Sequence, residues 1–308
     1  MRPIVFFGSG PVAAKSLELL ASDFKILAVI TKPKPAHHHG SFPVIDIATQ
    51  LNLSIYTASN KQDLAILFRN EIFPSDLAVL IDFGIIVGQD VIDYFPKGIV
   101  NSHFSLLPEW RGADPITFAI LSGQKQTGVS LMLLVKAMDE GPLLAQATYD
   151  IPEDVTATSL TDDLIELSYK SLQTILPMYS GNEIQPGEQL DVSIKPNQGI
   201  SYSRKLTKQD GVLDFNKSAF LLEREIRAFI EWPKSKTKLA GKEVIVTKAH
   251  SVASANPHAS IGDIDVVKDT GVLSIKCADG SLCVDMIKPA GKNEMTIKAF
   301  LAGYGQHL

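Results

Sequence analysis

The chain has 308 residues, of which 45% are hydrophobic and 20% charged, and its formal net charge is −5. This composition fills one large domain or two ordinary ones, and no apolar run approaches the roughly 20 residues that cross a bilayer. The apolar start of the chain breaks at Gly8 and is soon followed by Lys15, so we expect no secretion signal.

Cysteine is scarce, since Cys277 and Cys283 are the two in the chain. A disulfide framework uses more cysteines, and a structural zinc site normally needs four good ligands. We therefore expect two reduced thiols in a strand region, no bound metal and a cytoplasmic location.

The charge is uneven along the chain. Residues 1–200 hold 13 Lys and Arg against 22 Asp and Glu, whereas residues 201–308 hold 16 against 12. An acidic first part joined to a basic second part indicates a polyanionic partner for the second part. A small positive excess is also an ordinary surface, so nucleic-acid binding is one of two interpretations at this point.

Short apolar runs alternate with helical patterns through the first half. Strands are expected at Pro3–Phe7, Lys25–Thr31, Leu77–Ile81, Gly98–Ser102 and Gly128–Val135. Helices are expected at Val12–Leu20, Pro43–Leu51, Asp63–Ile72 and Thr156–Tyr179. The alternation predicts a Rossmann-like α/β domain, a mostly parallel sheet with helices on both faces. Ligands of such sheets bind beyond the carboxyl ends of the strands, so functional residues are expected there.

The second half has a different pattern. Asn182–Gly199 is rich in Pro, Gly and Asn, a linker composition, and a helix is expected near Ala219–Phe229. Short β-like runs then follow at Glu243–Lys248, Ile261–Val267, Val272–Cys277 and Leu282–Ile287. This spacing predicts a small β-barrel. We therefore expect a catalytic domain over residues 1–182, a linker over residues 183–200 and a C-terminal domain over residues 201–308.

Asn101 and His103 lie two residues apart on a predicted strand and point to the same side. An amide and an imidazole side by side could donate hydrogen bonds to an oxyanion, and the imidazole could move a proton. A capping Asn beside a buried structural His explains the same pair.

Asp139 follows the predicted strand Gly128–Val135 and should lie on the same rim as His103. A carboxylate there would raise the pKa of the imidazole and hold one tautomer. A turn residue before Gly141-Pro142 is the alternative interpretation of Asp139.

The motif Asn101-x-His103, continued by Ser105-Leu106-Leu107-Pro108 and Trp110-Arg111-Gly112-Ala113, resembles the signature of the formyltetrahydrofolate-dependent formyltransferases. Within that family the chain is most similar to the members that formylate methionyl-tRNA. Further similarity lies at Thr127-Gly128-Val129, Asp139-x-Gly141, Tyr202–Lys208, Ile226–Phe229, Trp232-Pro233 and Lys288–Lys292. The resemblance therefore spans nearly the whole chain.

The resemblance implies an OB-like C-terminal barrel that helps to hold the initiator methionyl-tRNA, and a monomeric enzyme without a metal. It implies that Asn101, His103 and Asp139 are catalytic and that 10-formyltetrahydrofolate donates the formyl group to an attacking amine. The residues implied to contact the folate are Phe83, Gly84, Ile85, Ile86, Ser105, Leu106, Leu107 and Pro108. Those implied to contact the acceptor are Lys32, Lys34, Arg111 and Gly112.

Two further hypotheses about the function stay open. Glu109 and Asp114 add carboxylates near the expected acceptor mouth, and a short loop carries His37-His38-His39, so a nucleotide-linked amino sugar is an alternative acceptor. A non-catalytic RNA-binding protein is the alternative from another class. Deleting residues 201–308 should cripple tRNA formylation and spare a small acceptor.

Overall fold

The computed structural model describes residues 3–35, 40–189, 199–253, 258–267 and 270–307. By its internal contacts the chain forms two compact units. Unit 1 comprises Met1–Pro115, Gln126–Asp150 and Thr161–Ser203, and unit 2 comprises Ile116–Lys125, Ile151–Leu160 and Arg204–Leu308. Two short segments from the first half of the chain thus belong to unit 2.

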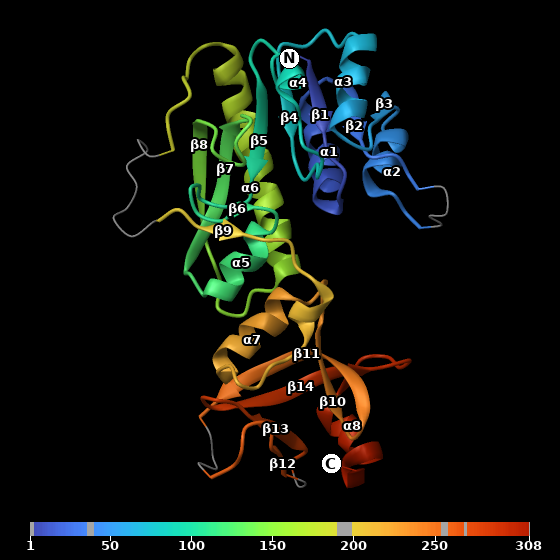
Figure 1. Cartoon of the computed structure of the whole chain (residues 1–308), viewed down its shortest axis with the longest axis vertical. Helices are drawn as coiled ribbons and strands as arrows, with labels where there is room; N and C mark the ends of the chain where they lie inside the picture. Colours follow the sequence, from blue (N-terminus) through green and yellow to red (C-terminus); the bar gives the residue numbers. More distant parts are fainter. Residues whose placement is uncertain (1–2, 36–39, 190–198, 254–257, 268–269, 308) are drawn as a thin grey trace. The chain divides into compact units, whose positions relative to one another are not determined.

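Unit 1 is built on a seven-stranded sheet in the order β3-β2-β1-β4-β5-β7-β8 (Figure 1). Its strands are β1 (Ile4–Phe7), β2 (Ile26–Thr31), β3 (Ile55–Thr57), β4 (Ala78–Leu80), β5 (Ile99–His103), β7 (Gln126–Leu133) and β8 (Leu143–Asp150). The strands up to β5 are parallel, and β7 and β8 add antiparallel edges. The strand order reverses at β1 and β4, so the carboxyl ends of these strands mark the expected ligand edge.

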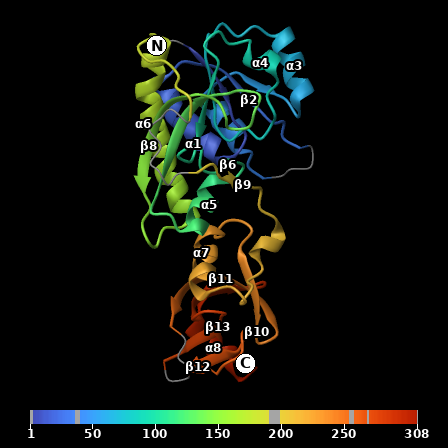
Figure 2. The same ribbon diagram turned by 60° about the vertical axis from the view of Figure 1, so that its left-hand side comes forward.

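Helices cover both faces of this sheet. They are α1 (Pro11–Asp23), α2 (Pro43–Gln50), α3 (Lys61–Asn70), α4 (Gln89–Ile92) and α6 (Ala157–Ser180), whereas α5 (Pro115–Ser122) belongs to unit 2 except for its first residue. Alternate residues Val5 and Phe7 of β1 pack with Leu64 and Phe68 of α3 in one core. On α6, Gln173 donates a hydrogen bond of 2.9 Å to Asp23, which places this helix beside α1 (Figure 2). The predicted α/β class is confirmed.

Unit 2 contains an antiparallel sheet in the order β10-β11-β14-β13-β12, with β15 paired to β14. Its elements are α7 (Ala219–Ala228), β10 (Ser235–Leu239), β11 (Lys242–Val252), β12 (Ile264–Val267), β13 (Val272–Lys276), β14 (Ser281–Pro289), β15 (Met295–Thr296) and α8 (Ile297–Tyr304). A two-residue strand pair, β6 (Arg111–Gly112) with β9 (Tyr202–Ser203), lies in unit 1. The small C-terminal β domain expected from the sequence is confirmed, and its sheet is antiparallel.

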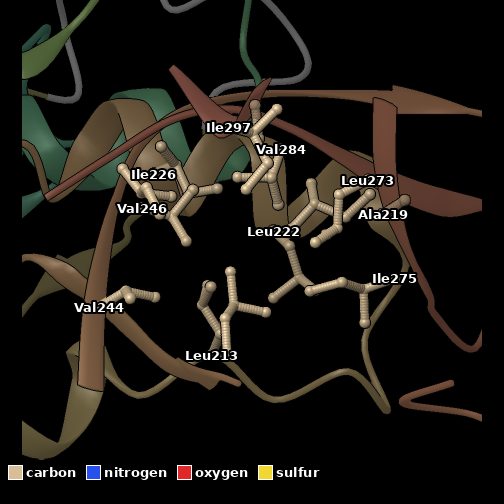
Figure 3. Close-up of a cluster of buried hydrophobic side chains, with 14 of the residues drawn as sticks. Leu213, Ala219, Leu222, Ile226, Val244, Val246, Leu273, Ile275, Val284 and Ile297 are labelled. Atoms are coloured by element: carbon tan, nitrogen blue, oxygen red, sulfur yellow. The ribbon is translucent and has the colours of Figure 1, made fainter. Parts of the chain in front are cut away.

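The core of unit 2 forms between α7 and the sheet. Figure 3 shows side chains from α7, the strands, α8 and the segment before α7 converging in this core, among them Leu213, Ala219, Leu222, Ile226, Val244, Val246, Leu273, Ile275, Val284 and Ile297. The cysteines Cys277 and Cys283 are free and buried, as expected for reduced thiols in a strand region. Apolar burial from one amphipathic helix face therefore stabilises this unit.

Replacing Leu222 with alanine should destabilise unit 2 by about 2–5 kcal/mol, because Leu222 is fully buried and its loss leaves a cavity. Phe220→Ala is the matched control, since Phe220 lies on the same helix but is 54% exposed. Chemical denaturation of the two variants measures the difference. An equal cost for both would contradict the assignment of Leu222 to the core.

Candidate active site

Asn101 and His103 lie at the carboxyl end of β5, between the parallel neighbour β4 and the antiparallel neighbour β7. Strand alternation puts both side chains on the same face, and each is 7% exposed. None of the described residues forms a hydrogen bond with the Asn101 amide. A buried amide without a protein partner is suited to donate to a bound group.

The structure brings Asp139 to His103. Asp139 Oδ2 lies 3.8 Å from His103 Nδ1, and the two side chains are 12% and 7% exposed. On the other side of the ring, His103 Nε2 donates to the Trp110 carbonyl at 3.0 Å, since a carbonyl can only accept. The backbone N–H of Gly112 donates to Asp139 Oδ2 at 2.7 Å. Asp139 and the segment Trp110–Gly112 therefore lie together around the His103 imidazole.

Burial lowers the pKa of the His103 imidazole below its usual range, and the Asp139 carboxylate and the Trp110 carbonyl oppose this shift only in part. The imidazole is therefore neutral near pH 7 in the free protein, with the proton on Nε2. A neutral ring beside a carboxylate can take up a proton during a reaction and release it again.

Glycine at position 112 is required by its surroundings. Its φ is +114°, and a Cβ there would lie 2.4 Å from the Ser203 carbonyl oxygen. Asp139 and Trp110 also have left-handed backbones, with φ of 52° and 54°. Non-glycine residues hold this conformation at a cost that surrounding contacts must offset, and such residues cluster at functional sites.

The predicted folate segment Ser105–Pro108 is held by hydrogen bonds from side chains of β7 and β8. Ser130 Oγ donates to the Ser105 carbonyl at 2.6 Å and accepts from the Leu107 N–H at 2.9 Å. Gln146 Nε2 donates to the Leu107 carbonyl at 2.8 Å. The side chains of the segment are buried. Ser130 and Gln146 are not predicted from the sequence, because a polar residue within an apolar strand is the only feature that marks them.

The other predicted folate segment, Phe83–Ile86, follows β4. Phe83 is buried in the core of unit 1, Gly84 has a φ of +65°, and Ile86 is 76% exposed. A Cβ on Gly84 would lie 2.9 Å from the Lys32 ammonium nitrogen, so Lys32 lies directly against this segment. Lys34 is exposed. The triple His37-His38-His39 falls outside the described residues.

Arg111, predicted to contact the acceptor, is 7% exposed and already has protein partners. Its Nη2 donates to Gln189 Oε1 at 2.7 Å, and its Nη1 lies 3.2 Å from Glu140 Oε1. The guanidinium thus supports the loop that carries Asp139. Glu109, one of the two acidic residues near the predicted acceptor site, is partly buried, and burial raises the pKa of its carboxyl group.

Within the described ranges, no three His, Cys, Asp or Glu side chains are grouped so that they could hold a metal ion. Across the same ranges, every helix is too short or too polar to cross a membrane.

The grouping of Asn101, His103 and Asp139 at the carboxyl ends of the strands of an α/β sheet is of the kind that can supply oxyanion and proton-transfer groups for group transfer. Residues 1–176 match the model of the formyl transferase family, and residues 205–305 match that of its C-terminal domain. The chain belongs to the formyl transferase family and is an enzyme, as the motif resemblance predicted.

Among its relatives, the methionyl-tRNA formyltransferase of Methylococcus capsulatus is 34% identical, over 97% of this chain and 96% of the relative. That of Magnetococcus marinus is 30% identical, over 98% and 95%. Of solved structures, an N-formyltransferase from Helicobacter canadensis aligns with a TM-score of 0.66 at 19% identity, covering 92% of this chain and 98% of that one. HypX from Aquifex aeolicus aligns with a TM-score of 0.63 at 15% identity, covering 99% and 48%. The two structures share the fold.

Proposed function

We propose that this enzyme transfers the formyl group of 10-formyltetrahydrofolate to the amino group of methionyl-tRNA. The observation that carries the proposal is similarity to methionyl-tRNA formyltransferases along nearly the whole chain, including residues 205–305. The grouping of Asn101, His103 and Asp139 at the sheet edge supports the chemistry. The basic balance of residues 201–308 supports a polyanionic acceptor.

In this mechanism the acceptor nitrogen attacks the formyl carbon directly. A new C–N bond forms, the carbonyl oxygen becomes an oxyanion, and the bond from the formyl carbon to N10 of the folate then breaks. The Asn101 amide, which lacks a partner among the described residues, donates a hydrogen bond to the oxyanion. Preformed donors in a buried site stabilise such a charge without reorganisation.

The attacking nitrogen must lose a proton, and the leaving N10 must gain one. Neutral His103 accepts the proton, and Asp139 stabilises the imidazolium that results. The imidazolium then returns the proton to N10, directly or through a water molecule. The Trp110 carbonyl at Nε2 fixes the ring so that Nδ1 and Asp139 face each other.

The folate is proposed to lie against Phe83–Ile86 and Ser105–Pro108. The residues of the second segment are buried, and Ser130 and Gln146 hold its backbone in place. Lys32 lies against Gly84 and supplies a positive charge beside this position. A folate tail carries carboxylates, which Lys32 would attract.

The deciding experiment measures labelled formyl transfer from 10-formyltetrahydrofolate to initiator methionyl-tRNA, with a nucleotide-linked amino sugar in a parallel reaction. Labelled formyl-methionyl-tRNA is expected. Labelled sugar alone would keep the formyl chemistry and replace the acceptor. No product with either acceptor would overturn the proposed acceptors and donor.

Acceptor binding should weaken as salt rises, because each phosphate contact releases counterions. If about four phosphates are contacted, affinity for the tRNA should fall roughly 50- to 150-fold between about 50 and 200 mM salt. Titration of labelled tRNA at several salt concentrations measures the slope, with tetrahydrofolate binding under the same conditions as the control. A flat slope for tRNA would contradict recognition through phosphates.

A further inference from the structure

Gln189 is a polar residue in a segment of linker composition, yet it is only 3% exposed. Its side-chain amide makes three hydrogen bonds. Nε2 donates to the Asp139 carbonyl at 2.7 Å and to the Gly141 carbonyl at 2.9 Å, and Oε1 accepts from Arg111 at 2.7 Å. A buried amide whose oxygen and nitrogen are both used specifies one position for the groups around it.

The position of Gln189 is itself fixed by backbone pairing two residues earlier. Gly187 N donates to the Leu143 carbonyl at 2.8 Å, and Leu143 N donates to the Gly187 carbonyl at 2.6 Å. Leu143 is the first residue of β8, so this segment is anchored to the edge of the sheet. The amide is therefore held in place and can in turn hold a neighbour.

The neighbour is the turn that carries Asp139. The turn is tightly packed, since a Cβ on Gly141 would lie 1.7 Å from the Leu133 carbonyl oxygen. Asp139 has a left-handed backbone, a conformation that needs external support in a non-glycine residue. The two bonds from Gln189 Nε2 clamp the carbonyls on either side of Glu140, and thereby supply that support.

The Gln189 amide also acts, through Arg111, on the backbone group that holds the Asp139 carboxylate. Arg111, bonded to Gln189 Oε1, is followed by Gly112, whose N–H holds the Asp139 carboxylate at 2.7 Å. Gln189 thus fixes the Asp139 main chain directly and the strand that holds its side chain indirectly. The separation of 3.8 Å between Asp139 and His103 depends on both anchors.

We propose that Gln189 is a positioning residue for formyl transfer, which acts by holding Asp139 in register with His103. The proposal rests on the proposed function. It assigns no contact with substrate to Gln189, since the amide is fully engaged with protein groups.

Gln189→Leu removes all three hydrogen bonds with little change in volume. It should lower kcat about 10- to 100-fold with less than about a threefold change in either KM, because small misplacements of a catalytic group are costly. Gln173→Leu is the matched control, since its amide bonds to Asp23 on α1 and it should leave both constants unchanged. Unchanged kcat in folded Gln189→Leu, or an increase in KM alone, would overturn the proposal.

The variant Gln189→Glu tests whether Gln189 acts by positioning Asp139 or only through its hydrogen bond with Arg111. A glutamate keeps the acceptor for the guanidinium but directs a second oxygen at the Asp139 and Gly141 carbonyls. It should therefore be as slow as Gln189→Leu at neutral pH. Full activity of Gln189→Glu would show that only the Arg111 contact matters and would overturn the proposal.

A measurement that needs no substrate tests the positioning role of Gln189 independently of the proposed function. The titration of His103, followed by NMR of ¹⁵N-labelled histidine with His103→Ala for assignment, reports the charge beside the ring. In Gln189→Leu its midpoint should move down towards that of Asp139→Asn, because Asp139 is no longer held nearby. An unchanged midpoint would overturn the positioning role even if no acceptor were formylated.

Discussion

Replacing His103 with alanine is expected to slow formyl transfer at least ~100-fold, the scale of a lost acid–base group. His103 is 7% exposed, it faces Asp139, and its Nε2 is fixed by the Trp110 carbonyl. Without the ring, the attacking nitrogen loses its proposed base and N10 loses its proposed acid. The loss should therefore fall on kcat, measured with both substrates saturating.

Ser102→Ala is the matched control for this experiment. Ser102 is the preceding residue of the same strand, and its hydroxyl bonds to Ser168 on α6 at 2.7 Å, on the opposite face of the sheet. It should retain activity within a few-fold, because strand alternation keeps it out of the site. Near-normal turnover of His103→Ala would remove the residue from the mechanism. A large loss in Ser102→Ala would mean that perturbation of the strand explains both results.

The sequence predicts the α/β unit well because its central strands are continuous apolar runs, such as Ile26–Thr31. It misses the edge strands β3, β8 and β10, where the pattern is mixed, although the predicted run Ile261–Val267 covers the edge strand β12. In β10, with the sequence Ser-Lys-Thr-Lys-Leu, the lysines face outwards, as is usual for an edge. It also misses α5, whose apolar residues show no helical period. The inclusion of Ile116–Lys125 in unit 2 depends on contacts between distant segments, which local patterns do not encode.

The residues of the candidate site likewise fall into those that local sequence patterns predict and those that depend on contacts between distant segments. Asn101 and His103 follow from strand spacing, and Asp139 follows from its place after a strand. Gln189 could not be predicted, because its segment has the composition of a linker and its burial arises from pairing between Gly187 and Leu143. Local pattern therefore predicts the residues carried by strands, whereas the residues that support them require the tertiary structure.

Replacing Asp139 with asparagine is expected to lower kcat about 100-fold or more. Asparagine retains an oxygen that can accept from the Gly112 N–H, so the loop keeps one anchor while the charge is removed. An imidazolium at His103 would then lie in a buried site without its counter-charge, and the barrier rises accordingly. Asp150→Asn is the control, because Asp150 ends β8 and is exposed to solvent. Equal activity of the two variants would exclude Asp139 from the mechanism.

The pH dependence of Asp139→Asn tests the direction of the coupling. Burial lowers the pKa of His103 and the Asp139 carboxylate raises it, so removing the carboxylate leaves burial opposed only by the Trp110 carbonyl. Since neutral His103 is the base, activity is lost as pH falls and the imidazole takes up a proton. The acid limb of kcat/KM should thus move to lower pH. A limb that moves to higher pH would mean that the charge of Asp139 acts on another group, because loss of an anion cannot raise the pKa of a neighbouring imidazole.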